Sequence, residues 1–172
     1  MNNTEDIKTG FERRVMAMTK QPGIGKGVIQ ATSVYKEGLE CEIECGRWKM
    51  TADMSPRGGG SGAGPSPGEY MSMALGSCQV ITAVLWAARY EVPIEKLEVT
   101  FVVEKDARGL YGVDDQPSRW SGVSCRVDIQ SPASEKQIQK VLEAAWDHSP
   151  MRDNLEHPFS IKYESNITTP AL

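Results

Sequence analysis

The sequence has no excess of positive charge, because 19 Lys and Arg stand against 23 Asp and Glu and leave a formal net charge of -4. Nucleic-acid binding needs a strong basic field, and no cluster of Lys and Arg supplies one. The first nine residues are polar, include Glu5 and Asp6, and are not followed by an apolar segment. We therefore expect no targeting signal and a cytoplasmic protein that binds neither nucleic acid nor membrane.

Motifs for nucleotides and metals are also missing. The glycine-rich run at 56–65 is not followed by Gly-Lys-Ser/Thr and has no βαβ unit around it, so we expect a flexible loop rather than a nucleotide site. Cys41 and Cys45 lie about 13 Å apart along one predicted strand, which is too far for a disulfide and unlike a zinc knuckle. We predict that Cys41, Cys45 and Cys125 are reduced core residues, with no metal.

Alternation of apolar and polar residues predicts the strands of one α+β domain within the 172 residues. A three-stranded antiparallel meander is expected over 27–53, two strands around 97–103 and 123–129, and a last strand at 159–163. Ser134 and Gln137 have the spacing of a second capping box, and helical spacing of apolar residues over 138–145 predicts a second helix after it. A short helix that begins at Ser149 is expected to follow. The predicted order is βββ-α-ββ-α-β, with an N-terminal arm at 1–24, mobile or laid on a partner, and a single domain at 25–172.

A long central helix is predicted from Pro67 to Tyr90. Ser66 and Glu69 have the spacing of a capping box, Pro67 suits the first helical position, and Pro93 ends the helix. No charged residue occurs between Tyr70 and Ala88, a length that could span a bilayer. Polar residues are spread around this helix, at Ser72, Ser77, Gln79 and Thr82, and this distribution favours a buried core helix.

Cys78, near the middle of this helix, is the candidate reactive residue. Small neighbours such as Ala74, Gly76 and Ser77 would let another backbone or a ligand approach it closely. A thiol there becomes a nucleophile only if a nearby cation or base lowers its pKa; otherwise it is a core cysteine. Glu69 precedes it by nine residues, and at about 100° per residue this places the carboxylate on roughly the opposite helix face.

The segment from Gly64 to Cys78 resembles the signature of OsmC-like proteins, which include the organic hydroperoxide resistance (Ohr) proteins. That signature runs Gly-Pro-x-Pro-x-Glu-Leu, then small and apolar residues, then Gly-x-Cys, and the order of elements agrees along residues 25–165. The resemblance implies an α+β fold in which long central helices lie between antiparallel sheets of an intertwined homodimer, with active sites at the subunit interface.

The resemblance also implies a thiol peroxidase that reduces organic hydroperoxides without a metal or bound cofactor. The cysteine matching Cys78 attacks the peroxide, a second cysteine forms a disulfide with it, and external thiols or dithiols regenerate the enzyme. An arginine, oriented by a carboxylate, stabilises the thiolate in these proteins. Arg57 and Arg47 are the candidate arginines here, and Glu69 is the candidate carboxylate.

The sequence departs from this pattern at the second cysteine, because Ser149 stands at the matching position. Serine cannot form the disulfide, so the leading hypothesis is a one-cysteine peroxidase whose sulfenic acid is resolved by an external thiol. Cys41, Cys45 or Cys125 could substitute as the resolving thiol, and nothing in the sequence selects one. A binding or redox-sensing protein for a small apolar ligand, and a stress-related dimer without a ligand, are the alternatives.

Overall fold

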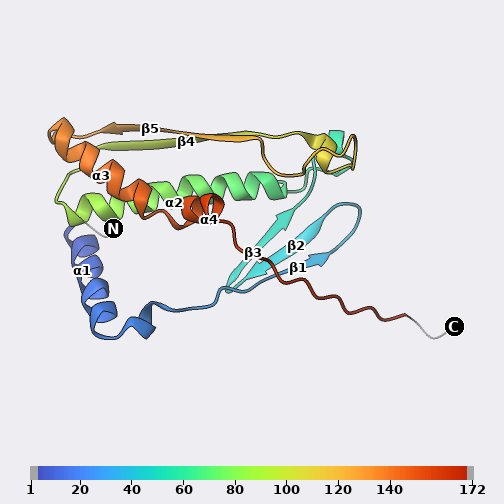
Figure 1. Cartoon of the computed structure of the whole chain (residues 1–172), viewed down its shortest axis with the longest axis horizontal. Helices are drawn as coiled ribbons and strands as arrows, with labels where there is room; N and C mark the ends of the chain where they lie inside the picture. Colours follow the sequence, from blue (N-terminus) through green and yellow to red (C-terminus); the bar gives the residue numbers. More distant parts are fainter. Residues whose placement is uncertain (1–3, 170–172) are drawn as a thin grey trace.

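Helix α2, Pro67–Arg89, is the axis beside which the other elements lie (Figure 1). The computed structural model describes residues 4–169. A hairpin of β4, Lys96–Glu104, and β5, Gly122–Gln130, runs along one side of α2, and α3, Glu135–Asp147, packs beside it. The short helix α4, Pro150–Glu156, follows α3 and also contacts α2. The mixed helix and sheet architecture confirms the predicted α+β class.

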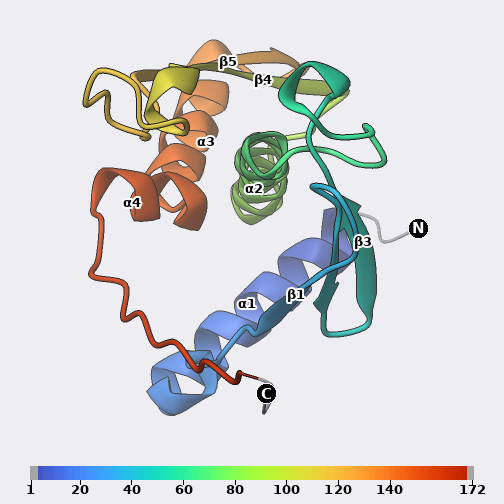
Figure 2. The ribbon, with the colours of Figure 1, turned by 90° about the vertical axis from the view of Figure 1, so that its right-hand side faces the viewer.

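A three-stranded antiparallel sheet forms a second layer near the N-terminal end of α2 (Figure 2). Its order is β1, Ala31–Tyr35, then β2, Cys41–Cys45, then β3, Trp48–Ala52, as the predicted meander requires. Ile43 lies opposite Ser33 on one side and Met50 on the other. Tyr70 joins this layer to α2, because its hydroxyl donates a hydrogen bond of 2.7 Å to the carbonyl of Thr51.

Local signals in the sequence place the helix ends correctly. Capping boxes form at both predicted positions, with Ser66 and Glu69 at the start of α2 and Ser134 and Gln137 at the start of α3. Helix α2 ends at Arg89, one residue before the predicted boundary, and Glu91 then takes a positive φ of 57°. Around this end lies the best-buried apolar cluster of the described chain, Ala87, Val92 and Val141.

The N-terminal segment differs from the expected arm. Residues Thr4–Lys20 form helix α1, followed by a short 3-10 turn, Pro22–Gly25. Phe11 packs edge-on against Trp86 of α2 at 5.4 Å between ring centroids, and Glu12 pairs with Arg89. Acidic residues in its first turn and Lys20 in its last suit the helix dipole. The segment expected as an arm is therefore a helix that packs on the chain's own central helix.

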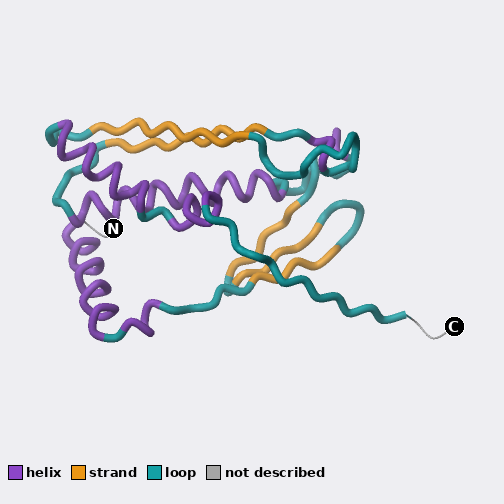
Figure 3. The backbone as a smooth tube through the Cα atoms, in the orientation of Figure 1, coloured by secondary structure: helices purple, strands orange, loops and turns teal. Residues whose placement is uncertain are grey.

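The last predicted strand is not formed within residues 4–169. Residues 157–169 run away from α4 without helix or strand structure (Figure 3). Phe159, Ile161 and Tyr163 are 68%, 85% and 89% exposed. The first strand is likewise shorter than predicted, with Val28 and Ile29 outside it and exposed. Apolar alternation is present in both segments, but a strand also needs a neighbour with which to pair.

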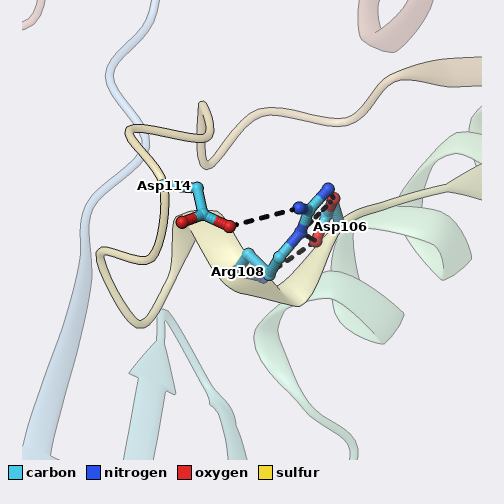
Figure 4. A network of polar contacts seen from close by, with 3 residues as sticks. All are labelled: Asp106, Arg108 and Asp114. Atoms are coloured by element: carbon cyan, nitrogen blue, oxygen red, sulfur yellow. Dashed lines mark hydrogen bonds and ion pairs between the residues drawn. The ribbon is translucent and has the colours of Figure 1, made fainter.

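The long loop between β4 and β5 is organised by one arginine (Figure 4). Arg108, in the 3-10 turn Ala107–Gly109, donates to both carboxylate oxygens of Asp106, through Nε at 3.0 and 3.2 Å and Nη2 at 2.6 Å. Its Nη1 also lies 3.5 Å from an oxygen of Asp114. These ion pairs hold a polar loop that contributes little to the core.

Helix α2 passes a test of length and composition for a membrane-spanning helix, and within residues 4–169 it does so alone. Only a third of the most apolar 18-residue stretch of this helix is buried inside the chain. Its buried residues include the polar Gln79 and Thr82. The prediction of a buried helix is thus met on one side of α2, whereas Met71, Met73 and Ile81 remain exposed.

Val141 tests the importance of the cluster at the end of α2. Its side chain is 0% exposed, so Val141→Ala should lower the free energy of unfolding by about 2 kcal/mol, through lost burial and a residual cavity. Val15→Ala on the exposed face of α1 is the matched control and should change it by less than about 0.5 kcal/mol. Urea denaturation of both variants measures the difference, and equal effects would contradict this assignment of the core.

Candidate functional site

Cys78 and Ser149 meet where α4 contacts α2. The sulfur of Cys78 lies 3.5 Å from the hydroxyl oxygen of Ser149, although the two residues are 71 positions apart. Ser149 is only 2% exposed, and Cys78 is half-buried. The structure therefore brings together the predicted reactive thiol and the position of the replaced second cysteine.

Ser149 stands at the N-cap position of α4, as predicted, but its side chain makes no capping hydrogen bond. Its backbone carbonyl accepts from the amide of Asp153 and so begins the helix, while the hydroxyl points to the sulfur. Pro150 follows at the first helical position, where the lack of an N–H is tolerated. The turn between α3 and α4 thus delivers a buried hydroxyl to Cys78.

The small residues around Cys78 leave open space in this chain. A Cβ placed at Gly76 would have no atom within 4 Å, outside its chain neighbours and its own helix backbone. The hydroxyl of Ser77 donates to the carbonyl of Ala74 at 3.2 Å, and that of Thr82 donates to the carbonyl of Cys78 at 2.7 Å. The side of α2 at Gly76 therefore remains free for a ligand or a second polypeptide.

Glu69 does not reach Cys78. Its Oε2 accepts hydrogen bonds of 2.7 Å from both the backbone amide and the hydroxyl of Ser66. These bonds, with a smaller contribution from the charge of Lys105, lower the pKa of Glu69 below its usual value. The carboxylate is therefore ionised at neutral pH and occupied in the capping box, on the far side of α2 from the thiol.

An open groove of about 510 Å³ lies beside Glu69, between the glycine-rich loop and the first turns of α2. Its walls include Pro56, Pro65, Ser72 and Met73. Cys78 is not among the lining residues, so the groove and the thiol are separate features of the single chain.

Neither arginine expected to support the thiolate contacts it in the described chain. Arg57 lies in the 3-10 turn Pro56–Gly58 and is exposed. Arg47 is also exposed, and its guanidinium lies 4.7 Å from the ring centre of Trp48. Their predicted roles would need a second chain to bring them to Cys78.

Arg152 was not among the predicted site residues, and it is the only arginine within residues 4–169 that is not exposed. Its guanidinium lies 5.3 Å from the ring centre of Trp146, and its Nη1 pairs with Glu156 at 3.1 Å. Its Nε is buried and has no hydrogen-bond partner in the described chain. The spacing of three residues from Ser149, which puts both on one face of α4, was the available signal.

Asp53 organises the glycine-rich loop and is 2% exposed. It accepts hydrogen bonds from the amides of Met54, Ser61 and Ala63 and from the hydroxyl of Ser61, at 2.7 to 3.1 Å. These hydrogen bonds lower the pKa of Asp53 to about 2, and the bond from the Ser61 hydroxyl contributes most. The loop was expected to be flexible, but here one buried carboxylate fixes its path.

Glycine is required at two points of this loop by close backbone contact, and a Cβ at Gly60 would lie 2.0 Å from the carbonyl oxygen of Met54. A Cβ at Gly64 would lie 2.2 Å from the carbonyl oxygen of Thr51, which no real contact allows. Pro65 then accepts a hydrogen bond from the amide of Asp53 through its carbonyl. The loop is thereby pressed against β3 just before α2 begins.

The other cysteines make no competing site. Cys41, Cys45, Cys78 and Cys125 are all free thiols, but Cys41, Cys45 and Cys125 are half-buried rather than the core residues that were predicted. Burial raises the pKa of Cys125, which makes its thiolate scarce at neutral pH. Within residues 4–169 no three or more His, Cys, Asp or Glu side chains are grouped to hold a metal ion.

Comparison with known proteins defines the family. A family profile described as "OsmC-like protein" matches residues 58–164, a span that contains both Cys78 and Ser149. The chain therefore belongs to the OsmC-like family, and the resemblance seen in the sequence is confirmed.

Individual relatives are distant. A hydroperoxide reductase of Mycoplasma pneumoniae is 23% identical over 140 residues, which is 80% of this chain and 93% of that protein. The crystal structure of an OsmC-like protein from M. pneumoniae superposes with a TM-score of 0.67 at 20% identity, over 77% of this chain and 90% of that one. An osmotic stress induced and detoxification response protein from Psychrobacter arcticus gives 0.61 at 18% identity, over 77% and 91%. At such identities the structures establish the shared fold alone.

The role of Asp53 can be tested by charge removal. Asp53→Asn should free the loop, so that trypsin cleaves after Arg57 at least about tenfold faster, because the amides of Ser61 and Ala63 lose an ionised acceptor. Asp128→Asn, on the exposed face of β5, is the matched control and should leave cleavage unchanged. Equal cleavage of the two variants would show that other contacts hold the loop.

The same carboxylate predicts a pH dependence. Its pKa is lowered by folding, so the stabilisation it gives is fully present above the ordinary aspartate value of 3.8 and is lost as pH falls toward about 2. The amide signals of Ser61 and Ala63 should change over that interval in NMR spectra, together with the carboxyl signal of Asp53. A carboxyl titration with a midpoint near 4 would contradict the assignment.

Proposed function

We propose that this chain is a thiol-dependent peroxidase that reduces organic hydroperoxides through Cys78. The family membership, the name of the M. pneumoniae relative and the position of Cys78 on the central helix support the proposal. The observation that carries it is the contact between Cys78 and Ser149, because it joins the family's reactive position to the place of its second cysteine. The cytoplasm, where thiols are reduced, would supply the electrons.

The reaction follows from the chemistry of a thiolate. The Cys78 sulfur attacks one oxygen of the hydroperoxide, the O–O bond breaks, and the alkoxide leaves and takes a proton as the alcohol. The sulfur is oxidised to a sulfenic acid. Ser149 has no sulfur to condense with it, so an external thiol forms a mixed disulfide and releases water, and a second thiol restores Cys78.

A homodimer completes the proposal. Met71, Met73 and Ile81 of α2 are exposed, as are the apolar residues of the C-terminal segment, and such surfaces are typical of sites that bind another polypeptide. In the single chain Glu69 faces away from Cys78, and Arg57 is free at the surface. A second copy could bring such groups to the thiol, which would place the active sites at the subunit interface.

The dimer predicts a particle of twice the chain mass of 18.9 kDa in light scattering after gel filtration. Ile161→Asp should weaken dimerisation at least about tenfold, because a charge would enter the apolar interface. Thr168→Asp, farther along the same exposed segment, is the control and should remain dimeric. A wild-type monomer at micromolar concentration would contradict the dimer.

A binding protein is the second candidate, and the open groove of about 510 Å³ favours it. Pro56, Pro65 and Met73 give the groove apolar walls suited to a small apolar ligand. In this case Cys78 would serve in packing or as a redox sensor. A Cys78 thiol that titrates near the free-cysteine value of about 8.5, measured by alkylation against pH, would favour binding over catalysis.

Turnover of an alkyl hydroperoxide with a dithiol reductant tests the peroxidase. Cys78→Ser should reduce the rate to that of the reductant alone, because serine is not ionised at neutral pH. Cys125→Ser is the matched control and should keep most of the activity, since burial makes that thiol a poor nucleophile. Full activity in Cys78→Ser, or none in the wild type with lipoyl and simple dithiols alike, would refute the proposal.

A further inference from the structure

We infer that Ser149 is a positioning residue for Cys78: its hydroxyl donates a hydrogen bond to the sulfur and stabilises the thiolate and then the sulfenate. This role rests on the proposed peroxidase reaction but concerns a different property, the state of the sulfur itself. Ser149 thus supplies a hydrogen-bond donor at the position where the family pattern has a second, reacting cysteine.

The direction of the hydrogen bond follows from the ionisation state. In the neutral thiol either atom can donate across the 3.5 Å between Sγ and Oγ. A thiolate has no hydrogen, so only the serine can then donate, and a hydrogen bond to a charged group is the stronger kind. Ionisation of Cys78 therefore strengthens the contact, and the contact in turn favours ionisation.

The surroundings leave the hydroxyl committed to this contact. Ser149 is only 2% exposed, so water competes little for the proton of its hydroxyl. Within residues 4–169 its Oγ has no other hydrogen-bond partner, and it does not cap α4. A buried hydroxyl without a partner would be unfavourable, and the sulfur satisfies it.

The same hydroxyl suits the oxidised intermediate. Attack on the hydroperoxide transfers one oxygen to sulfur and releases the alcohol, and the product sulfenate carries charge on that oxygen. Ser149 can donate a hydrogen bond to that oxygen, but it has no thiol to attack the sulfenic sulfur, form a disulfide and release water. The sulfenic acid then persists until an external thiol reaches it, forms the mixed disulfide and releases the water.

Several charged groups on the elements around α2 have partners other than Cys78. Ion pairs join Lys8 to Glu91, Arg89 to Glu12, Arg152 to Glu156 and, on β4, Lys96 to Glu98. Glu69 is hydrogen-bonded to Ser66, and the His148 ring contacts the carbonyl of Ala144 and packs at a tilt against Trp86. None of these contacts involves the sulfur. Ser149 is therefore the one recorded side-chain hydrogen-bond partner of Cys78 in residues 4–169.

Alkylation of Cys78 by iodoacetamide across pH measures the effect without any peroxide. Ser149→Ala should raise the midpoint of the alkylation profile by about 0.5 to 1 pH unit and slow the reaction at pH 7 by about threefold to tenfold. Ser77→Ala is the matched control, because that neighbouring hydroxyl donates to Ala74 and not to sulfur. An unchanged midpoint in Ser149→Ala, or an equal shift in Ser77→Ala, would overturn the inference.

A second variant tests the placement of the side chain. Ser149→Cys should form a disulfide with Cys78 after one equivalent of hydroperoxide, seen as the loss of two hydrogens by mass spectrometry. In the wild type, trapping by dimedone should instead detect a sulfenic acid, which should be shorter-lived in Ser149→Ala. Failure of Ser149→Cys to form the disulfide would show that position 149 does not face the sulfur in solution.

The two proposals fail in different ways. If the wild type has no turnover but Ser149→Ala raises the alkylation midpoint, the peroxidase proposal is refuted and the role of the Ser149 hydrogen bond is supported. Turnover dependent on Cys78, with no change of midpoint in Ser149→Ala, would support the peroxidase and refute the role of Ser149.

Discussion

The need to bury an apolar helix of 23 residues governs this structure. Helix α2 receives the β4–β5 hairpin along one side, α3 and α4 along another, and α1 across its C-terminal end. These elements bury Leu75, Ala83, Ala87 and Ala88, yet Met71, Met73 and Ile81 stay exposed. Exposed apolar surface is unfavourable in water, and we propose that a second copy of the chain covers this side of α2.

The two ends of the candidate site depend on different kinds of contact. The glycine-rich loop follows a path set by the carboxylate of Asp53, because three backbone amides and one hydroxyl converge on it. The thiol of Cys78 instead depends on the turn between α3 and α4, which presents Ser149 from another part of the chain. The loop leads into the first turn of α2, whereas the turn between α3 and α4 supplies the hydroxyl beside the sulfur.

Sequence reasoning succeeded where short-range interactions decide structure. The capping boxes at Ser66 and Ser134 and the β1–β2–β3 meander need only nearby residues, and they formed as predicted. Prediction failed where a residue far along the sequence stabilises the element. Helix α1 was missed because Phe11 is stabilised by Trp86, 75 positions along the sequence. The strand at 159–163 was predicted from its alternation, but in one chain it has no neighbour with which to pair.

The sequence by itself determined the family signature from Gly64 to Cys78, the serine at position 149, and the opposed helix faces of Glu69 and Cys78. These follow from residue identity and from the helical repeat, which are local properties. Only the tertiary structure decided that the Ser149 hydroxyl meets the sulfur, that Asp53 orders the loop, and that Arg152 is the half-buried arginine near this turn. The reason is physical: contacts between distant segments depend on how whole elements pack, and no short stretch of sequence contains that information.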